Sequence, residues 1–148
     1  MPSLASATST PFAVLANEWN WLTVEDALAI HDDQLLRFGG AAGIKSIELL
    51  ESALAAPINL QCYTHENSVI RLGAHLAHAI VKNHPFVDGN KRTATIAFLE
   101  FLYMHGLMIE VDDTPSRQPL AELVEQLASD KISAPQFAET LRRHLVEV

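Results

Sequence analysis

Two long apolar stretches dominate the hydrophobic pattern of the chain, and both have the spacing of buried helices. Residues 68–83 read SVIRLGAHLAHAIVKN and residues 93–106 read TATIAFLEFLYMHG, so that neither stretch leaves a wide polar face. Only a short polar loop separates them. The pattern therefore predicts a buried helical hairpin whose polar groups gather at the end where the two helices meet.

Shorter amphipathic segments precede the hairpin. A helix capped by Thr23 is predicted first, and His31 lies on its apolar face. We interpret His31 as a hydrogen-bonded core residue and not as a ligand. A second helix is predicted over 47–55, because Pro57 indicates a stop, and residues 57–67 are predicted to be an irregular connection.

The rest of the chain predicts a tail and a few further elements. A short extended piece is predicted within 107–119, followed by a helix over 120–128 and another from Ala134 onward. Residues 1–17 are rich in Ser, Thr, Ala and Pro, and we expect them to form a flexible N-terminal tail. The sequence therefore predicts an all-α fold of about six helices around the central hairpin, in one domain over residues 18–148.

Composition and charge narrow the classes of function. The chain has 148 residues, is 49% hydrophobic and has a net charge of −8, from 18 acidic and 10 basic side chains. That balance argues against binding to nucleic acid or to an anionic membrane surface, both of which need a basic face. The start is not basic like that of a signal peptide, no apolar run is long enough to span a membrane, and the single cysteine excludes an internal disulfide. These features favour a cytoplasmic protein.

Candidate chemistry concentrates in the loop of the hairpin, where residues 84–93 read HPFVDGNKRT. Asn90 is the predicted N-cap of the second helix, which places Lys91 and Arg92 in its first turn. Exposed cations at that end oppose the helix dipole by roughly 0.3–1 kcal/mol each. A bound anion would remove the conflict, because backbone N–H groups, the dipole and both side chains would all face it.

The other polar residues of the loop suit a polyphosphate–magnesium site. Gly89 lets the backbone approach an anion closely. Asp88 is a suitable ligand for Mg²⁺, which prefers carboxylate and phosphate oxygens. His84 suits the role of a general base near neutral pH. Each residue alone also fits a plain turn with solvated side chains, whereas the ordered set favours the site.

This ordered set resembles the signature of the Fic/Doc family, His-x-Phe-x-Asp/Glu-Gly/Ala-Asn-x-Arg, and is most similar to the Doc branch, in which Lys follows the Asn. The resemblance extends over roughly residues 21–145. It implies the Fic fold and a toxin of a type II toxin–antitoxin system. Such a toxin moves part of ATP onto a Ser or Thr hydroxyl of a protein, which for the Doc branch is elongation factor Tu, and a small, partly disordered antitoxin is its cognate partner.

The same resemblance implies a role for each residue of the loop. His84 would deprotonate the target hydroxyl, and Asp88 would position Mg²⁺. The phosphate cradle of ATP would consist of four consecutive residues, Gly89, Asn90, Lys91 and Arg92. Pro85 and Phe86 would give structural support to the loop. The family also has a flap before the core helices that holds the target chain, and this role would fall within 57–67.

Two departures from the adenylylating members of the family favour a kinase. Those members resemble one another in having Gly after the Asn and a second Arg three residues after the first, where this chain has Lys91 and Thr95. Lys91 narrows the nest of backbone N–H groups, and the missing Arg removes a clamp on the terminal phosphates. We therefore expect transfer of the γ-phosphate. The alternatives are AMP transfer to a protein hydroxyl and a non-catalytic Fic-like interaction module.

Inhibition is expected to come from another chain. Self-inhibited Fic proteins resemble one another in a motif Ser/Thr-x-x-x-Glu-Gly/Asn, but residues 62–67 (CYTHEN) have Cys62 in place of the hydroxyl residue. A disordered antitoxin segment that folds into an apolar groove is the expected inhibitor, and self-inhibition by Glu66 is not expected. His75 and His78 share a helix face, but no third ligand at a suitable spacing supports a zinc site.

Overall fold

The structure is a computed structural model that describes residues 19–112 and 118–148, so the expected tail over 1–17 lies outside the described residues. Six helices and two short strands form within the described ranges, in the order α2 (Val24–Phe38), α3 (Ile47–Thr64), α4 (Val69–Asn83), α5 (Asn90–Met104), β1 (Leu107–Ile109), α6 (Pro119–Ala128), α7 (Ala134–Arg142) and β2 (Leu145–Glu147). The predicted all-α fold is confirmed. None of the described helices is both long and apolar enough to cross a membrane.

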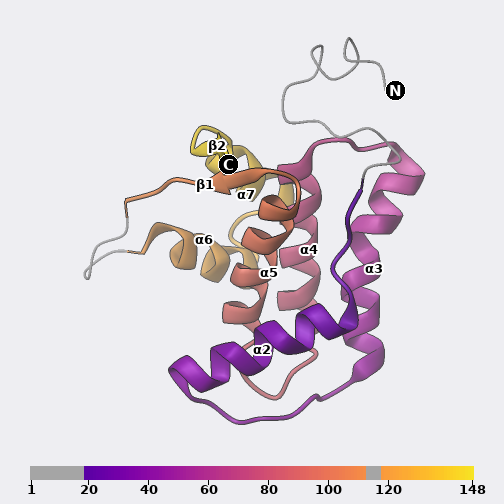
Figure 1. Cartoon of the computed structure of the whole chain (residues 1–148), viewed down its shortest axis with the longest axis vertical. Coiled ribbons are helices and arrows are strands. Elements are labelled where there is room, and N and C mark those ends of the chain that lie inside the picture. Colours follow the sequence, from indigo (N-terminus) through magenta and orange to yellow (C-terminus); the bar gives the residue numbers. More distant parts are fainter. Residues whose placement is uncertain (1–18, 113–117) are drawn as a thin grey trace.

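The hairpin of α4 and α5 forms the centre of the molecule, as the apolar pattern predicts. Figure 1 shows the two helices in the middle, with α3 on one side and α6 on the other. Gly73 of α4 allows a close approach of the helices, since a Cβ there would lie only 3.1 Å from Phe98 Cδ1 of α5. Phe98 is completely buried and meets Phe137 of α7 edge to face, with ring centroids 5.1 Å apart. Helix α5 is therefore packed tightly along its length, which fixes the position of its first turn.

Helix α3 is much longer than the sequence predicts. The predicted stop before Pro57 is wrong, because α3 continues through this residue to Thr64. Proline removes the hydrogen bond to the carbonyl four residues earlier, that of Ala53. However, α3 packs against α4, and four of its residues are buried: Leu50, Ala53, Leu54 and Pro57. Burial of this face stabilises a helix that local propensity alone would end.

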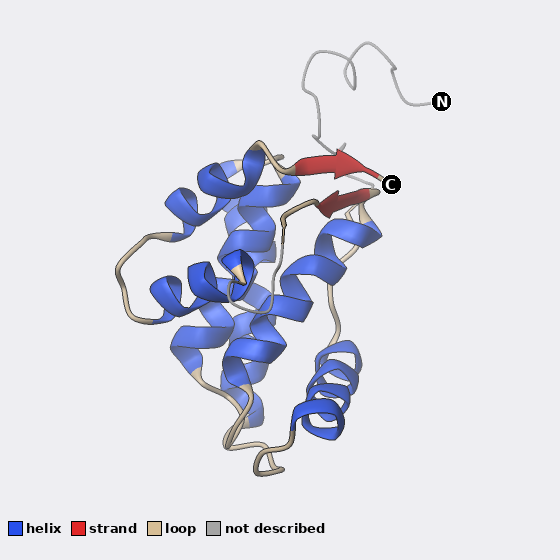
Figure 2. Cartoon of the chain, turned by 90° about the vertical axis from the view of Figure 1, so that its left-hand side faces the viewer, coloured by secondary structure: helices blue, strands red, loops and turns tan. Residues whose placement is uncertain are grey.

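A two-stranded antiparallel sheet closes the end of the molecule opposite the hairpin loop. Strand β1 follows α5 and confirms the extended piece predicted within 107–119, whereas β2 is too short to give a recognisable alternation in the sequence. Leu107 pairs with Glu147, and Ile109 pairs with Leu145. Figure 2 shows both strands at one end of the helices. The loop that joins α4 to α5 lies at the other end.

Candidate active site

The loop between α4 and α5 turns through two residues with positive φ. His84 ends α4 in the left-handed conformation, with φ 51°, and Gly89 occupies the N-cap position of α5, with φ 80°. Between them Pro85 and Phe86 are buried, whereas His84 and Asp88 are exposed. The loop therefore presents its titratable side chains to solvent, while two of its apolar residues, Pro85 and Phe86, pack into the core beneath them.

Asn90 holds this loop together from the inside. Its Oδ1 accepts a hydrogen bond from the Phe86 N–H at 3.0 Å, and its Nδ2 donates to the Phe86 carbonyl at 2.9 Å. Asn90 is 4% exposed. The prediction that it is the N-cap is therefore wrong, because its amide bonds across the loop and Gly89 takes the cap position. A contact between Asn90 and an anion would have to use its backbone N–H.

His31 supports the same loop from α2. Its ring stacks on Phe86, with centroids 3.8 Å apart and planes inclined by 7°. Its Nε2 lies 2.8 Å from the carbonyl oxygen of Asp88, and since a carbonyl only accepts, Nε2 carries the proton and donates. With the residue 3% exposed, the interpretation of His31 as a hydrogen-bonded core residue is confirmed.

Asp88 presents an ionised carboxylate at the mouth of the loop. Its Oδ2 accepts a hydrogen bond from the Ala41 N–H at 3.2 Å, and its Oδ1 accepts one from the Gly89 N–H at 2.8 Å. These two N–H groups, and then the positive charge of Arg92, hold the pKa of Asp88 below its ordinary value. Each carboxylate oxygen keeps a further lone pair, so the group can still bind a divalent cation.

Arg92 covers the C-terminal end of α2. Its guanidinium donates to the Gly39 carbonyl at 3.1 Å and to the Gln34 carbonyl at 3.5 Å, and its central carbon lies 5.6 Å from the centroid of the Phe38 ring. These contacts use only part of the five N–H donors of arginine. The guanidinium is thus positioned beside the loop and retains donors for an anion.

Gly40 makes a close approach that the sequence analysis did not find. A Cβ at this position would lie 2.7 Å from Asp88 Oδ2 and 3.2 Å from an Arg92 nitrogen, and its φ is 120°. The sequence signal that could have pointed to it is the cluster of glycines over 39–43, which reads GGAAG. No local pattern could connect it with the loop, because Ala41 and Asp88 are 47 positions apart.

Residues 43–46 run beside the loop as extended chain. The Lys45 N–H donates to the Pro85 carbonyl at 2.7 Å, and the Val87 N–H donates to the Gly43 carbonyl at 3.1 Å. The predicted irregular connection over 57–67, in which a flap was expected, is wrong, because residues 57–64 belong to α3. The extended segment at the candidate site comes instead from before α3.

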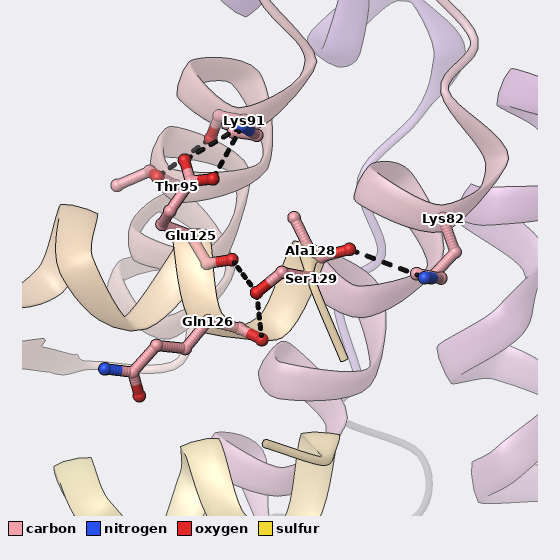
Figure 3. Close-up of polar contacts among 7 residues, drawn as sticks. All are labelled: Lys82, Lys91, Thr95, Glu125, Gln126, Ala128 and Ser129. Carbon is pink, nitrogen blue, oxygen red and sulfur yellow. Dashed lines mark hydrogen bonds and ion pairs between the residues drawn. The ribbon is translucent and has the colours of Figure 1, made fainter. Parts of the chain in front are cut away.

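Helix α6 contributes the opposite side of the site through an ion pair. Lys91 Nζ lies 2.8 Å and 3.0 Å from the two carboxylate oxygens of Glu125 (Figure 3). Lys82, at the end of α4, lies 2.7 Å from Asp130 Oδ2 and donates to the Ala128 carbonyl at 3.4 Å. The cations that the sequence places at the loop are therefore partly neutralised by acids near the end of α6, which the sequence analysis did not connect with it.

These elements enclose a cleft of about 460 Å³. Its lining includes six residues predicted for the site, together with three apolar ones: His84, Asp88, Gly89, Asn90, Lys91, Arg92, Val81, Val87 and Ala128. Pro85 and Phe86 do not line the cleft and lie buried beneath the loop. One cleft thus brings together the predicted base, the predicted metal ligand and the start of α5.

The chemistry of this lining fits a polyphosphate with a divalent cation. The first-turn N–H groups of α5 have no acceptor within their own helix and, with the helix dipole, attract an anion. No described residue forms a hydrogen bond with the His84 imidazole, which leaves both ring nitrogens accessible to a reacting group. Asp88 supplies an exposed carboxylate at hydrogen-bonding distance from Gly89, beside the same helix start.

His75 and His78 lie away from this loop. They line a separate cleft of about 420 Å³ together with residues of α3 and α7, and burial lowers the pKa of both imidazoles. Across the described ranges no three potential ligands gather to hold a metal ion. We therefore assign no metal to this pair.

Comparison with known proteins gives a consistent result. The family model described as Fic/DOC matches residues 21–102. The protein kinase doc of Escherichia phage P1 is 31% identical over 122 residues, which cover 82% of this chain and 93% of that protein. The toxin Doc of Mycolicibacterium smegmatis is 32% identical over 81 residues, which cover 52% of this chain and 60% of that protein.

Proposed function

The chain belongs to the Fic/Doc family, and on that basis we propose that it is a Doc-type toxin that transfers the γ-phosphate of ATP to a Ser or Thr hydroxyl of a protein. The observation that carries the proposal is the single cleft in which an exposed imidazole, an ionised carboxylate and a helix N-terminus meet. The phage P1 relative, which is named a protein kinase, supports phosphate transfer.

His84 is the proposed general base. The target hydroxyl gives its proton to the imidazole while its oxygen bonds to the γ-phosphorus, and the bond from that phosphorus to the β-phosphate oxygen breaks to release ADP. The exposure of His84 at the rim of the cleft suits a group that must meet another protein. Its place at the fixed end of α4 holds the imidazole near the start of α5.

The phosphates of ATP are proposed to lie against the first turn of α5. Gly89 leaves room for an oxygen, and the N–H groups of Asn90, Lys91 and Arg92 face that end of the helix. Asp88 would hold Mg²⁺, which supplies positive charge to the phosphate oxygens when bound. Pro85 and Phe86 support this arrangement from beneath, because they fix the loop to the core.

Transfer of the γ-phosphate is favoured over transfer of AMP by two residues of α5. Thr95 stands where adenylylating members resemble one another in having a second arginine, and its hydroxyl is already used in a bond to the Lys91 carbonyl at 2.9 Å. Lys91 fills the position that is glycine in those members. The missing guanidinium leaves fewer donors for a nucleotide that presents its α-phosphate, and the Lys91 side chain narrows the nest of backbone N–H groups.

The biological setting is part of the same proposal. We infer a type II toxin–antitoxin pair in the cytoplasm, with a cognate antitoxin as inhibitor and elongation factor Tu as the target whose modification blocks translation. The position of Glu66 supports inhibition by another chain. Its carboxylate accepts from the Ser68 N–H at 3.1 Å and pairs with Arg71 at 3.6 Å, at the end of α4 remote from His84.

A transfer assay with labelled ATP tests the proposed function. The protein is incubated with purified elongation factor Tu, Mg²⁺ and ATP that carries the label on either the γ- or the α-phosphate. The proposal predicts a labelled target only with the γ-label, and none when Mg²⁺ is chelated. A target labelled from the α-phosphate would contradict the kinase proposal and indicate an adenylyltransferase. Absence of any transfer would contradict the assigned target.

A further inference from the structure

The ion pair between Lys91 and Glu125 joins two helices at the cleft. Lys91 lies in the first turn of α5 and lines the cleft, and Glu125 lies in the last turn of α6, three residues before the cleft residue Ala128. The ammonium lies at hydrogen-bonding distance from both carboxylate oxygens, 2.8 Å and 3.0 Å away (Figure 3). The ammonium group of Lys91 is therefore held against α6 at the side of the cleft and does not point to its centre.

Each partner stands at the wrong end of its own helix. A cation at the start of α5 and an anion near the end of α6 both oppose the dipole of the helix that carries them. The two unfavourable placements compensate each other when the side chains meet. This compensation stabilises the contact between α5 and α6.

The pair also removes the most available positive charge from the proposed phosphate site. Arg92 is committed in part to the carbonyls of Gly39 and Gln34, and Asp88 adds a negative charge. Lys91 is the remaining cation that lines the cleft within the described residues, and Glu125 neutralises it. A ligand with several negative charges needs that cation.

We propose that Glu125 is a positioning residue that holds Lys91 away from the phosphates and thereby lowers the affinity of the cleft for ATP. This inference rests on the proposed function, since it concerns the same cleft. When ATP binds, the lysine leaves the carboxylate and turns to a phosphate oxygen. The long side chain of Lys91 allows the exchange while its backbone stays in place, held by the hydrogen bond from Thr95.

The pair is suited to exchange because it is open to solvent. The side chains of Lys91 and Glu125 are 54% and 62% exposed. Exposed pairs of this kind are weak and are screened by salt, so a polyphosphate can replace the carboxylate. Glu125 itself stays on α6, whose last turn is stabilised by the hydrogen bond from the Ser129 hydroxyl to the Glu125 carbonyl at 3.0 Å.

Titration of the full chain with ATP and Mg²⁺, without target, tests the inference. Glu125→Gln keeps the shape of the side chain and removes its charge, and we expect the Kd for ATP to fall roughly three- to fivefold. In a Lys91→Met background the same substitution should change the Kd by less than about twofold, because the effect acts through the lysine. In the transfer assay the gain should appear in KM, with little change in kcat.

Asp130→Asn is the matched control. It removes the same charge from an ion pair with a lysine, Lys82, but neither partner lines the cleft, and Asn tolerates the positive φ of 61° at this position. We expect its Kd for ATP to match that of the unaltered protein. An equal gain in affinity for ATP in Asp130→Asn, or in Glu125→Gln combined with Lys91→Met, would overturn the inference, because it would show a general effect of net charge.

The outcomes separate the inference from the proposed function. If the unaltered protein binds ATP and Glu125→Gln binds it no more tightly, the inference is overturned and the proposed function stands. If the unaltered protein and the variants all fail to bind ATP, the proposed function is overturned and the inference falls with it. Thermal unfolding of each variant shows whether a change in Kd reflects the cleft or a loss of folded protein.

Discussion

At the scale of single residues, the loop separates side chains that support it from side chains that face solvent. His84 is exposed and unbonded by any described residue, whereas Asn90 is buried and bonded twice to Phe86. Substitutions at these two positions should therefore have opposite signatures. A substitution at His84 should lower transfer activity without loss of stability, whereas a substitution at Asn90 should lower the stability of the fold.

His84→Ala is expected to fold normally and to lose transfer activity. The side chain is exposed and makes no described hydrogen bond, so the melting temperature should stay within about 2 °C of the unaltered protein. Loss of a general base should lower kcat roughly 10²- to 10⁴-fold. Thermal unfolding and the labelled-ATP assay measure the two effects, and a fully active His84→Ala protein would remove the residue from the mechanism.

Asn90→Ala is expected to destabilise the fold. The substitution leaves the buried N–H and carbonyl of Phe86 without their partner, and each unsatisfied group costs about 1–3 kcal/mol. Denaturant unfolding should show this loss. Asn90→Asp is a useful comparison, since it keeps the acceptor for the Phe86 N–H but loses the donor. Unchanged stability in Asn90→Ala would show that the amide does not brace the loop.

At the scale of elements, the sequence specifies the central hairpin because nearly every position of α4 and α5 obeys the same apolar pattern. Prediction from the sequence fails where the local preference of a residue is overridden by tertiary packing. Pro57 predicts a stop, but the buried face of α3 continues across it against α4. The strand β2 escapes prediction for a different reason, because three residues paired with a distant strand carry no periodic signal.

The junction of α3 and α4 gives a prediction on inhibition. Glu66 pairs with Arg71 and accepts from the Ser68 N–H, which ties it to the start of α4. Glu66→Gln keeps an acceptor for Ser68 and removes the charge, so transfer activity of the isolated protein should stay within about twofold of the unaltered chain. A sharp rise in activity would mean that Glu66 inhibits the site in its own chain.

At the scale of the whole molecule, the candidate site is assembled from segments that are far apart in the sequence. The ten residues of the loop are contiguous, so their chemistry could be predicted from the sequence. Their surroundings could not, because His31, Ala41 and Glu125 reach the loop only through the packing of α2 and α6 on the hairpin. Two of the ten basic side chains of this acidic chain, Lys91 and Arg92, thereby lie together in the first turn of α5.

The measurement that tests the central claim most directly is the intact mass of elongation factor Tu after incubation with this protein, ATP and Mg²⁺. The account predicts that the target gains the mass of one phosphate, and that the gain is absent with His84→Ala. A gain equal to AMP would contradict the γ-phosphate transfer proposed here. An unchanged mass, with the protein folded and bound to ATP, would contradict the proposed target.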